Sequence, residues 1–329
     1  MRKKFLHNYY DIICLENLLL AWEEFLIGKT SKNDVQRFSR RLIDNIFDLH
    51  KCLADKNYCH GDYTDFFIND PKRRHIHKAS VRDRLIHHAV YRQLYPFFDE
   101  TFIADSYSCR VGKGTHRALN RFREFAYKVS CNNTKTCWIL KCDIRKFFDN
   151  ISHQILNMIL EKYIPDKNIK WLLRNIINSY HTDDLATKGL PLGNLTSQLL
   201  TNIYMNEFDQ WVKHRLKVKF YLRYADDFVI MSRSKIYLQN LVLPIYLFLK
   251  EYLALSLHPK KVFIQTLASG VDFLGWVHFP DHRILRAATK QRAVSKIREN
   301  PANETLQSYL GLCRHGNAKQ FAQKIEYLV

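Results

Sequence analysis

The spacing of apolar residues predicts that the chain begins with helices. Between residues 8 and 55, apolar side chains recur every three or four positions, which is the period of one helix face. The first stripe consists of Leu18, Leu19, Trp22, Phe25 and Leu26, and the second of Phe38, Leu42, Ile46 and Leu49. We interpret both stripes as core packing. Two further helices, both basic, are predicted over residues 81–98 and 115–129.

Runs of aromatic and β-branched residues predict short strands among the helices. Two hairpins are predicted, one around a basic turn within residues 66–76 and one within 219–231. A single strand is predicted over 138–143, and short strands follow up to about 285. Helices are predicted over 153–164, with Ser152 as N-cap, and over 168–180, 195–215, 237–254 and about the last 45 residues. Strands interleaved with helices and hairpins indicate an α+β core.

The charge of the chain favours a polyanionic partner. Its 329 residues are 47% hydrophobic, enough for one large core or a few subdomains, and its formal net charge is +19. Such a surplus of Lys and Arg favours nucleic acid and, second, an acidic membrane surface. The longest apolar run, Leu241 to Leu249, is short and contains Pro244, so we expect no membrane-spanning helix. The N-terminus lacks the apolar segment of a secretory signal.

The cysteines and histidines give no metal pattern. None of the eight cysteines forms a Cys-x-x-Cys pair, which argues against a zinc ribbon. A chain of this length folds without disulfides, so we expect reduced cysteines and a cytoplasmic protein. The adjacent His87 and His88 would point in different directions on a helix, so we expect them at a surface or interface.

The segment Tyr224-Ala225-Asp226-Asp227 places two adjacent carboxylates between two predicted strands. Acids at the turn of a tight hairpin are held on a rigid support. Carboxylate oxygens are the ligands that Mg²⁺ prefers, and Mg²⁺ leaves coordination positions open for phosphates. A hydrated turn is the alternative, because Asp is common in turns.

Asp143 is a third candidate acid, at the end of the strand predicted over 138–143. A buried carboxylate needs a partner, because an unpaired buried charge is costly. Eighty-three residues separate Asp143 from Asp226, so only the fold can bring them together. Three carboxylates on two strands would hold two metal ions about 3.5–4 Å apart, an arrangement that suits in-line phosphoryl transfer.

From about residue 65 to the C-terminus, the chain resembles the reverse transcriptases. Asp143 to Ile151 resembles the first catalytic motif of that family, and Tyr224 to Asp227 its metal-binding hairpin. The other matching segments are Gly189 to Gln198, which would position template and nucleotide, Leu257 to Lys261, which carries a nucleotide-side lysine, and the primer-grip hairpin Phe273 to Trp276. They follow one another in the order of the family.

The resemblance implies a right-hand polymerase of the α+β class, with fingers, a ferredoxin-like palm and a short helical thumb. It implies an N-terminal helical extension over 1–64, fingers over 65–134, a palm over 135–280 with finger helices within 153–188, and a thumb over 281–329. The implied reaction is RNA-directed addition of deoxynucleotides to a 3′-hydroxyl.

The resemblance also implies roles for single residues. Asp143 and Asp226 would bind two Mg²⁺ ions, or Mn²⁺ in their place, with Asp227 beside them. The carbonyl of Ile144 would complete one coordination sphere. Phe148 would lie against the sugar 2′ position and leave no room for a hydroxyl, which implies deoxynucleotide substrates.

A larger set is implied to contact nucleotide and primer. The nucleotide-binding residues are Lys72, Arg74, Arg110, Phe148, Leu192, Gly193, Gln198 and Lys261. The primer grip consists of Phe273, Leu274, Gly275 and Trp276. The alternative for any single cation of the fingers, such as Arg73, is that it is an ordinary solvated surface charge.

Within the family, the chain is most similar to the reverse transcriptases of diversity-generating retroelements. Leu192 stands where most bacterial relatives have Gln, and Gln198 where they have Pro. Further similarity covers the helical N-terminus, Pro71 to Arg74, Asp83 to Leu85, Gly112 to His116 and the short thumb. Ala225 departs from the subfamily, in which a larger residue is common, and is typical of intron-type relatives.

This resemblance implies a mutagenic role and several partners. Such enzymes copy a template-repeat RNA into cDNA and misincorporate opposite adenine. A Gln beside the nascent pair can form hydrogen bonds that Leu192 cannot, and each lost contact is worth ~1–3 kcal/mol of discrimination. Packing of the loop is the alternative role of Leu192. The implied partners are template RNA, the cDNA/RNA hybrid, deoxynucleoside triphosphates and a small basic helical-bundle accessory protein, with no membrane.

Two other interpretations stay open. The first is another bacterial reverse transcriptase of ordinary fidelity, from a phage-defence or group II intron-like lineage. The chain leaves no room for a maturase or endonuclease domain after the thumb, which we take to disfavour a group II intron protein. The second is a non-catalytic RNA-binding protein on the same fold, which the three acids disfavour.

Overall fold

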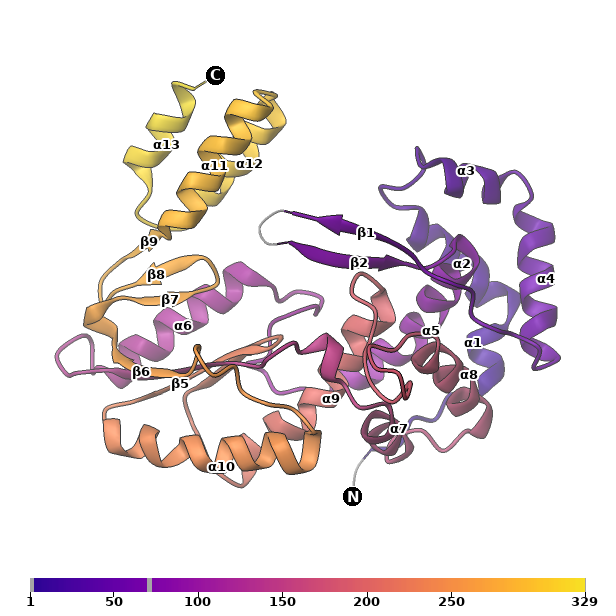
Figure 1. The fold of residues 1–329 in the computed structure, drawn as a ribbon, viewed down its shortest axis with the longest axis horizontal. Coiled ribbons are helices and arrows are strands. Elements are labelled where there is room, and N and C mark those ends of the chain that lie inside the picture. The colour runs from indigo at the N-terminus through magenta and orange to yellow at the C-terminus, as the bar shows by residue number, and fades with distance from the viewer. Residues whose placement is uncertain (1–2, 70–72, 329) are drawn as a thin grey trace. The chain divides into compact units, whose positions relative to one another are not determined.

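The computed structural model describes residues 3–69 and 73–328 (Figure 1). They form two compact units that alternate along the sequence. The first unit comprises Met1–Ile103, Lys146–Trp211 and Phe248–Ser256, and the second comprises Ala104–Arg145, Val212–Leu247 and Leu257–Val329.

The first unit begins with the predicted helices. They are α1 (Tyr9–Ile13), α2 (Leu15–Leu26), α3 (Asn33–Ser39), α4 (Leu42–Ala54) and α5 (Val81–Asp99), and α2 lies against both α4 and α5. Leu18, Trp22 and Phe25 are buried on one face of α2, as predicted. Leu19 is 39% exposed, so its assignment to the core was wrong. It follows Leu18 directly and therefore points about 100° away from the buried face.

The rest of the first unit contains a hairpin and three further helices. Strands β1 (Thr64–Ile68) and β2 (Arg74–Lys78) pair antiparallel, as the basic turn predicted. Helices α7 (His153–Glu161) and α8 (Lys167–Asn178) precede α9 (Leu195–His214), of which residues up to 211 belong to this unit. Ser152 caps α7 by accepting a hydrogen bond from the amide of Ile155 at 3.4 Å, as predicted. Helix α7 ends before the predicted residue 164, because Pro165 disfavours helical backbone at the residue before it.

The second unit is built on a four-stranded antiparallel sheet. Its strands are β3 (Trp138–Asp143), β4 (Tyr221–Tyr224), β5 (Asp227–Ser232) and β6 (Phe263–Thr266), in the spatial order β4-β5-β3-β6. Along the chain, helices separate β3 from β4 and β5 from β6. This βαββαβ order with β3 and β5 in the centre is the ferredoxin-like arrangement, so the predicted palm topology is confirmed.

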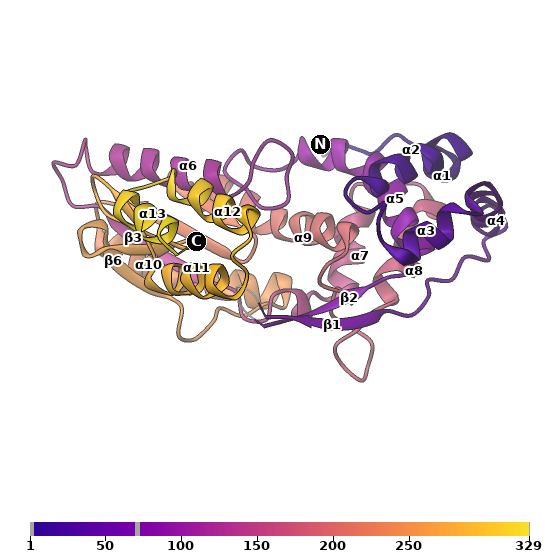
Figure 2. The same ribbon diagram turned by 90° about the horizontal axis from the view of Figure 1, so that it is seen from above.

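Two helices cover the sheet. Figures 1 and 2 show α6 (Thr115–Val129) and α10 (Lys235–Leu253, of which residues up to 247 belong to this unit) on opposite faces. Leu119, Phe122 and Phe125 of α6 enter a core that also contains Leu222 and Val229 of the sheet. Burial of this apolar face, rather than helix propensity, stabilises α6 on the strands.

A second sheet and three helices complete this unit. The sheet contains β7 (Val271–Phe273), β8 (Trp276–His278) and β9 (Arg283–Leu285), each antiparallel to the next. The helices are α11 (Ala287–Glu299), α12 (Asn303–Cys313) and α13 (Lys319–Glu326), which confirms the predicted helical C-terminal segment. Two short 3₁₀ turns span Phe148–Asn150 in the first unit and Leu267–Ser269 in the second.

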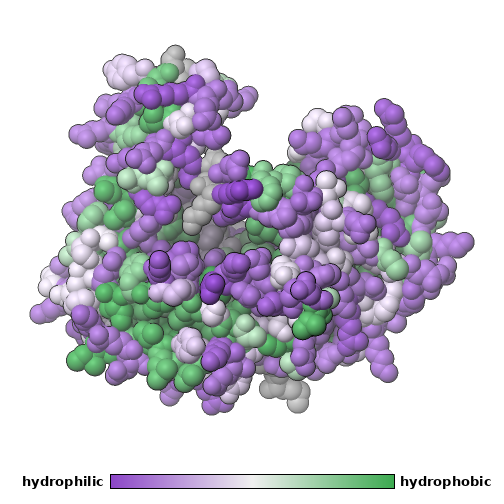
Figure 3. Space-filling model, in the orientation of Figure 1, coloured by the Kyte–Doolittle hydropathy of each residue, from purple (hydrophilic) through white to green (hydrophobic). Residues whose placement is uncertain are grey.

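The surface in Figure 3 is mostly hydrophilic, with an apolar area where α10 lies in Figure 1. The exposed apolar side chains of α10 include Ile236, Leu243 and Leu247. Leu238 and Ile245 of the same helix are buried. No helix in residues 3–69 or 73–328 is long and apolar enough to cross a membrane.

Candidate active site

The fold brings the predicted acids to one end of the palm sheet. Asp143 is the last residue of β3 and Asp227 the first of β5, and their Cα atoms are direct partners across the two strands. Asp226 precedes Asp227 in the tight turn after β4, and its carbonyl accepts a hydrogen bond from the amide of Ile144 at 3.2 Å. Ala225 has a φ of +54°, a left-handed conformation that reverses the chain. The turn therefore presents its acids beside the end of β3.

Two lysines contact these acids. The ammonium group of Lys261 lies 3.0 Å from both carboxylate oxygens of Asp143. Lys141 lies 3.3 Å from Oδ2 of Asp227 and donates a hydrogen bond to the carbonyl of Asp272 at 2.7 Å. The Lys261 ammonium thus balances the negative charge of the Asp143 carboxylate.

The Asp227 carboxyl is only partly compensated. Its pKa is raised to about 7: burial raises it most, the charge and hydrogen bond of Lys141 oppose that rise, and the neighbouring charges of Asp226 and Asp143 add to it. Its Oδ1 atom is buried and has no hydrogen-bond partner among the described residues. Hard divalent cations prefer carboxylate oxygens as ligands, and this unpartnered oxygen lies beside two further acids. The residue types therefore suit such a cation.

The carboxylates are not yet arranged as ligands. Among the described residues, no three acidic, histidine or cysteine side chains converge closely enough to hold a metal ion. Asp143 is engaged by Lys261 instead.

Arg223, which the sequence analysis did not identify, supports the turn that carries the acids. It is 1% exposed, and it donates hydrogen bonds to the carbonyl of Ala225 at 3.0 Å and to the hydroxyl of Ser106 at 3.1 Å. The amide of Tyr107 donates to the Arg223 carbonyl at 3.0 Å. A cation inside the apolar strand Tyr221–Tyr224 was the available signal, because a buried charge requires such partners.

The first unit contains a cavity of about 560 Å³ that brings together three predicted nucleotide-binding residues, Arg74, Phe148 and Leu192. Lys146 and Lys188 also line it. The cavity therefore combines cations suited to phosphate groups with apolar walls suited to a base or sugar.

Backbone contacts hold the loop that carries Leu192. The Leu192 carbonyl accepts a hydrogen bond from the amide of His77 at 3.1 Å, and the amide of Leu190 donates to the carbonyl of Phe148 at 2.9 Å. Gly193 has a φ of +112°, and a Cβ atom there would lie 2.9 Å from the Ile76 side chain. The loop thus depends on a glycine for both its conformation and its contact with β2.

Comparison with known families decides what this arrangement represents. The family model described as "Reverse transcriptase (RNA-dependent DNA polymerase)" matches residues 69–278, which include the acids, the cavity loop and the β7–β8 hairpin. The chain belongs to the reverse transcriptase family. RNA-directed DNA polymerisation is the activity that this membership supports, with a nucleic acid template and deoxynucleotide substrates.

Relatives of this reverse transcriptase include bacterial and intron-encoded proteins. Protein YkfC of Escherichia coli (strain K12) is 26% identical over 280 residues, which are 73% of this chain and 71% of YkfC. The group II intron-encoded protein LtrA of Lactococcus lactis subsp. cremoris is 24% identical over 311 residues, 74% of this chain and 50% of LtrA. Nuclear intron maturase 4 of Arabidopsis thaliana is 26% identical over 135 residues, 40% of this chain and 16% of that protein. The chain thus spans about half of LtrA and less of the maturase.

Two further nucleotide-binding candidates, Arg110 and Gln198, are not among the residues that line this cavity. Arg110 belongs to the second unit, where it donates a hydrogen bond to the carbonyl of Ser106 at 3.0 Å. Gln198 is half-buried in the first turns of α9. Lys72 lies outside the described residues. The guanidinium of Arg73 lies over the Phe67 ring, 4.1 Å from its centroid.

The predicted primer-grip hairpin is present as β7 and β8, but its aromatic side chains face inward. Phe273 is fully buried and Trp276 is 1% exposed, both within the core of the second unit. Leu274 and Gly275 form the turn, with φ values of +51° and +84°. Phe273 and Trp276 therefore anchor the turn in the core, and of these four residues only Leu274 and Gly275 are partly exposed.

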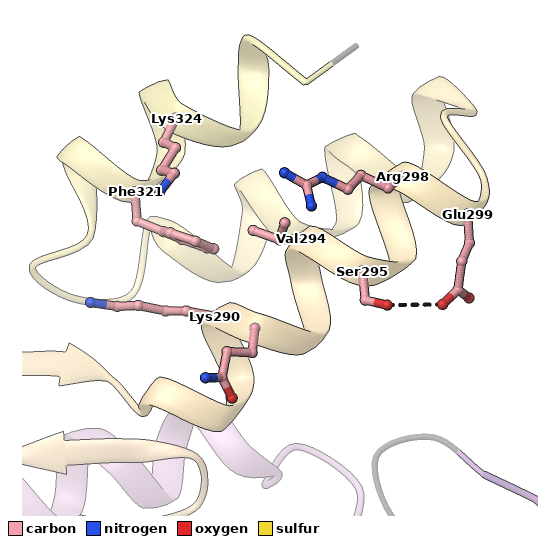
Figure 4. Close-up of a pocket in the computed structure, with 8 residues that line it drawn as sticks. Lys290, Val294, Ser295, Arg298, Glu299, Phe321 and Lys324 are labelled. Carbon is pink, nitrogen blue, oxygen red and sulfur yellow. Dashed lines mark hydrogen bonds between the residues drawn. The ribbon is translucent and has the colours of Figure 1, made fainter.

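The C-terminal helices carry a cationic cavity of about 560 Å³ (Figure 4). Figure 4 shows Val294 of α11 and Phe321 of α13 facing each other, with Lys290, Arg298 and Lys324 around them. No ion pair joins these three cations to any described residue. Their charge is therefore available to a polyanion.

Proposed function

We propose that this reverse transcriptase copies a template-repeat RNA into adenine-mutagenised cDNA as part of a diversity-generating retroelement. The observation that carries the proposal is Leu192, which lines the cavity shared with Phe148 and Arg74. An apolar side chain there offers no hydrogen bond to a nascent base pair. Loss of one good polar contact lowers discrimination by ~1–3 kcal/mol, enough for frequent errors at one template base.

For the chemical step, we propose that Asp143, Asp226, Asp227 and the carbonyl of Ile144 would hold two Mg²⁺ ions, or Mn²⁺. Such ions, when bound, activate the primer 3′-hydroxyl and neutralise charge on the leaving pyrophosphate. The unpartnered Oδ1 of Asp227 supports this assignment. Lys261, which contacts Asp143 in this structure, would contact the triphosphate of a bound nucleotide.

The cavity residues would select and orient the nucleotide. Phe148 would exclude a 2′-hydroxyl, and Arg74 and Lys146 would contact the triphosphate or template phosphates. Gly193 would let the loop backbone approach the templating base. We further propose that Gln198, Arg110 and Lys72 belong to this nucleotide and template surface.

We also propose a protein partner and a location. A small basic helical-bundle accessory protein would assist cDNA synthesis, and the protein would act in the cytoplasm on its template RNA and the cDNA/RNA hybrid. The support for the partner is the resemblance of Leu192, Gly193 and Gln198 to the diversity-generating subfamily, and the support for the cytoplasm is the eight free cysteines.

A group II intron-like reverse transcriptase of ordinary fidelity is the second candidate. Two observations favour it: the relatives include the group II intron-encoded LtrA, and Ala225 is typical of intron-type enzymes. A phage-defence enzyme would share the same fidelity.

Sequencing of cDNA separates these candidates. Purified protein would copy a defined primed RNA with Mg²⁺ and deoxynucleotides, with Asp226→Asn as the blank. Errors concentrated at template adenines would support the mutagenic role. Low errors spread evenly over the four bases would overturn it in favour of the second candidate.

Two variants test whether Leu192 carries the effect. Leu192→Gln should lower errors at adenine while leaving those at other bases nearly unchanged. Leu190→Met is the matched control, because Leu190 lines the same cavity and the change conserves volume without adding a hydrogen-bonding group. Equal error spectra for both variants would show that Leu192 only packs the loop.

A further inference from the structure

A second cationic cavity, of about 380 Å³, lies in the second unit, away from the catalytic acids. Its walls come from α6, from the β8–β9 turn, and from the segment that joins α12 to α13. The β8–β9 turn is at the opposite end of β8 from the Leu274–Gly275 turn, because the two turns flank one strand. The cavity is therefore distinct from the primer-side turn.

The cavity carries positive charge that no described acid balances. Arg123, Arg283 and Arg314 line it, and no ion pair or hydrogen bond joins Arg123 or Arg314 to a described residue. Asp281 is the single carboxylate among the described lining residues, and it contacts the ring of His282 at 2.8 Å. Like charges left close together favour an anion between them.

Two buried nitrogen atoms of the cavity wall also lack partners among the described residues. They are Nη1 of Arg283 and Nε2 of His278, and the His278 side chain belongs to a residue that is 3% exposed. The other Arg283 nitrogens are engaged: Nη2 donates to Asn120 at 3.2 Å, and Nε donates to the His315 carbonyl. Buried polar atoms are rarely left unpaired, so these two indicate a missing polar ligand.

The wall of this cavity is rigid. The amide of Asn317 donates to the Arg283 carbonyl at 2.8 Å, which fixes the segment after Arg314 against β9. Gly316 lies so close to the Trp276 ring that a Cβ atom would overlap it. Arg283 also stacks over Trp276, 5.5 Å from the ring centroid. The arginines are thus presented on fixed backbone rather than on a mobile surface.

We propose that this cavity binds a phosphate group, and that in use the group is a backbone phosphate of RNA outside the stretch being copied. Guanidinium groups match phosphate oxygens in geometry and remain charged at all working pH values. Arg123 and Arg314 are exposed at the mouth, whereas Arg283 is half-buried, so a phosphodiester can reach the cavity while its chain continues in solvent. Free inorganic phosphate has the same chemistry and is the other source.

The test compares two double variants that remove equal charge. Arg123→Gln with Arg314→Gln removes two cavity cations, and Lys128→Gln with Lys319→Gln removes two exposed cations from α6 and α13 outside the cavity. Because all four side chains are exposed, each variant should keep the fold. Circular dichroism checks this.

The RNA arm measures binding of a structured RNA as a function of salt, without nucleotides, so that it is independent of polymerase activity. Each phosphate contact contributes about 0.7–0.9 to the slope of log K against log salt. We expect the arginine variant to lower the slope by about 1 and the lysine variant to leave it near the wild-type value. Equal slopes for wild type and both variants would overturn the RNA source.

A second experiment tests binding of free inorganic phosphate. It compares the thermal unfolding midpoint of each protein in phosphate with its midpoint in chloride at equal ionic strength. Phosphate should stabilise the wild type and the lysine variant more than the arginine variant, whichever the natural source. If the three proteins respond equally and the RNA slopes are also equal, the cavity binds no phosphate. A phosphate response with equal slopes assigns the site to free phosphate.

Discussion

At the residue scale, Asp226 should be required for DNA synthesis but not for folding. It is partly exposed in the β4–β5 turn, so Asp226→Asn should keep the structure while removing a carboxylate from the site. Loss of several kcal/mol of transition-state stabilisation predicts at least about a thousand-fold slower primer extension. Extension rates with excess primed RNA check this.

Asp184→Asn is the matched control, because Asp184 is an exposed acid in the loop after α8. It should extend primers at the wild-type rate. RNA affinity should be nearly equal for both variants and the wild type. Primer extension by Asp226→Asn at the wild-type rate would contradict a catalytic role for this carboxylate.

His87 makes a separable prediction about pH. The sequence placed it at a surface or interface; it is 1% exposed, with Nδ1 2.8 Å from the Thr196 hydroxyl and Nε2 3.0 Å from His60. Burial lowers its pKa from 6.5 to about 3. Below about pH 6.5 the His87 imidazole is protonated in the unfolded chain but stays neutral in the folded chain. The free energy of unfolding therefore falls as the pH drops below about 6.5.

The size of this effect follows from the shift, at roughly 2 kcal/mol between about pH 7.5 and pH 5. His87→Gln can still bond Thr196 but cannot titrate, so it should lose that much less stability on acidification. Urea unfolding at both pH values measures the difference. His214→Gln, at an exposed histidine, should behave like the wild type. If His87→Gln lost as much stability as the wild type on acidification, His87 would not be the source of the pH dependence.

The three candidate acids were accessible from the sequence because they lie beside runs of residues that predict strands. What the sequence could not give were contacts set by the fold. The pairing of Lys261 with Asp143 joins residues 118 positions apart, and nothing local marks it. The burial of Phe273 and Trp276 on either side of the Leu274–Gly275 turn likewise follows from strand orientation, which a short motif does not define.

At the scale of elements, strand and helix bounds were well predicted where periodicity was strong. Strand β3 spans the predicted residues 138–143, since an apolar run there ends in an acid. Helix α2 was predicted, but not which neighbouring leucine faced solvent, because Leu18 and Leu19 fit one stripe equally well in sequence. The face is chosen by packing against α4 and α5.

Glycine positions give a prediction at this same scale. Gly193→Ala combines a left-handed backbone with a contact to Ile76 and should destabilise the protein by about 1–3 kcal/mol. Gly311→Ala, in α12, meets no atom within 4 Å and should stabilise it by about 0.5–1 kcal/mol. Urea unfolding of both variants measures the two signs. If both substitutions changed the free energy of unfolding equally, the loop at Gly193 would accommodate a side chain without strain.

At the scale of the whole molecule, the net charge of +19 predicts nucleic acid binding that weakens steeply with salt. The C-terminal helices should contribute specifically, because Lys290, Arg298 and Lys324 surround one cavity and have no acidic partner among the described residues. Changing all three to Gln should lower the salt slope of RNA/DNA hybrid binding by about 2–3. Filter binding between about 50 and 200 mM salt measures the slope.

The matched control for this triple variant changes the same residue types elsewhere. Lys32 immediately before α3, Arg37 on α3 and Lys51 on α4 are exposed, and none has an ion pair with a described residue. If the C-terminal helices hold the hybrid, changing these three to Gln should leave the slope nearly unaltered. An equal fall in both triple variants would mean that the hybrid responds to the summed field of the molecule. Contact with α11 and α13 would then not explain the binding, because long-range charge acts without regard to position.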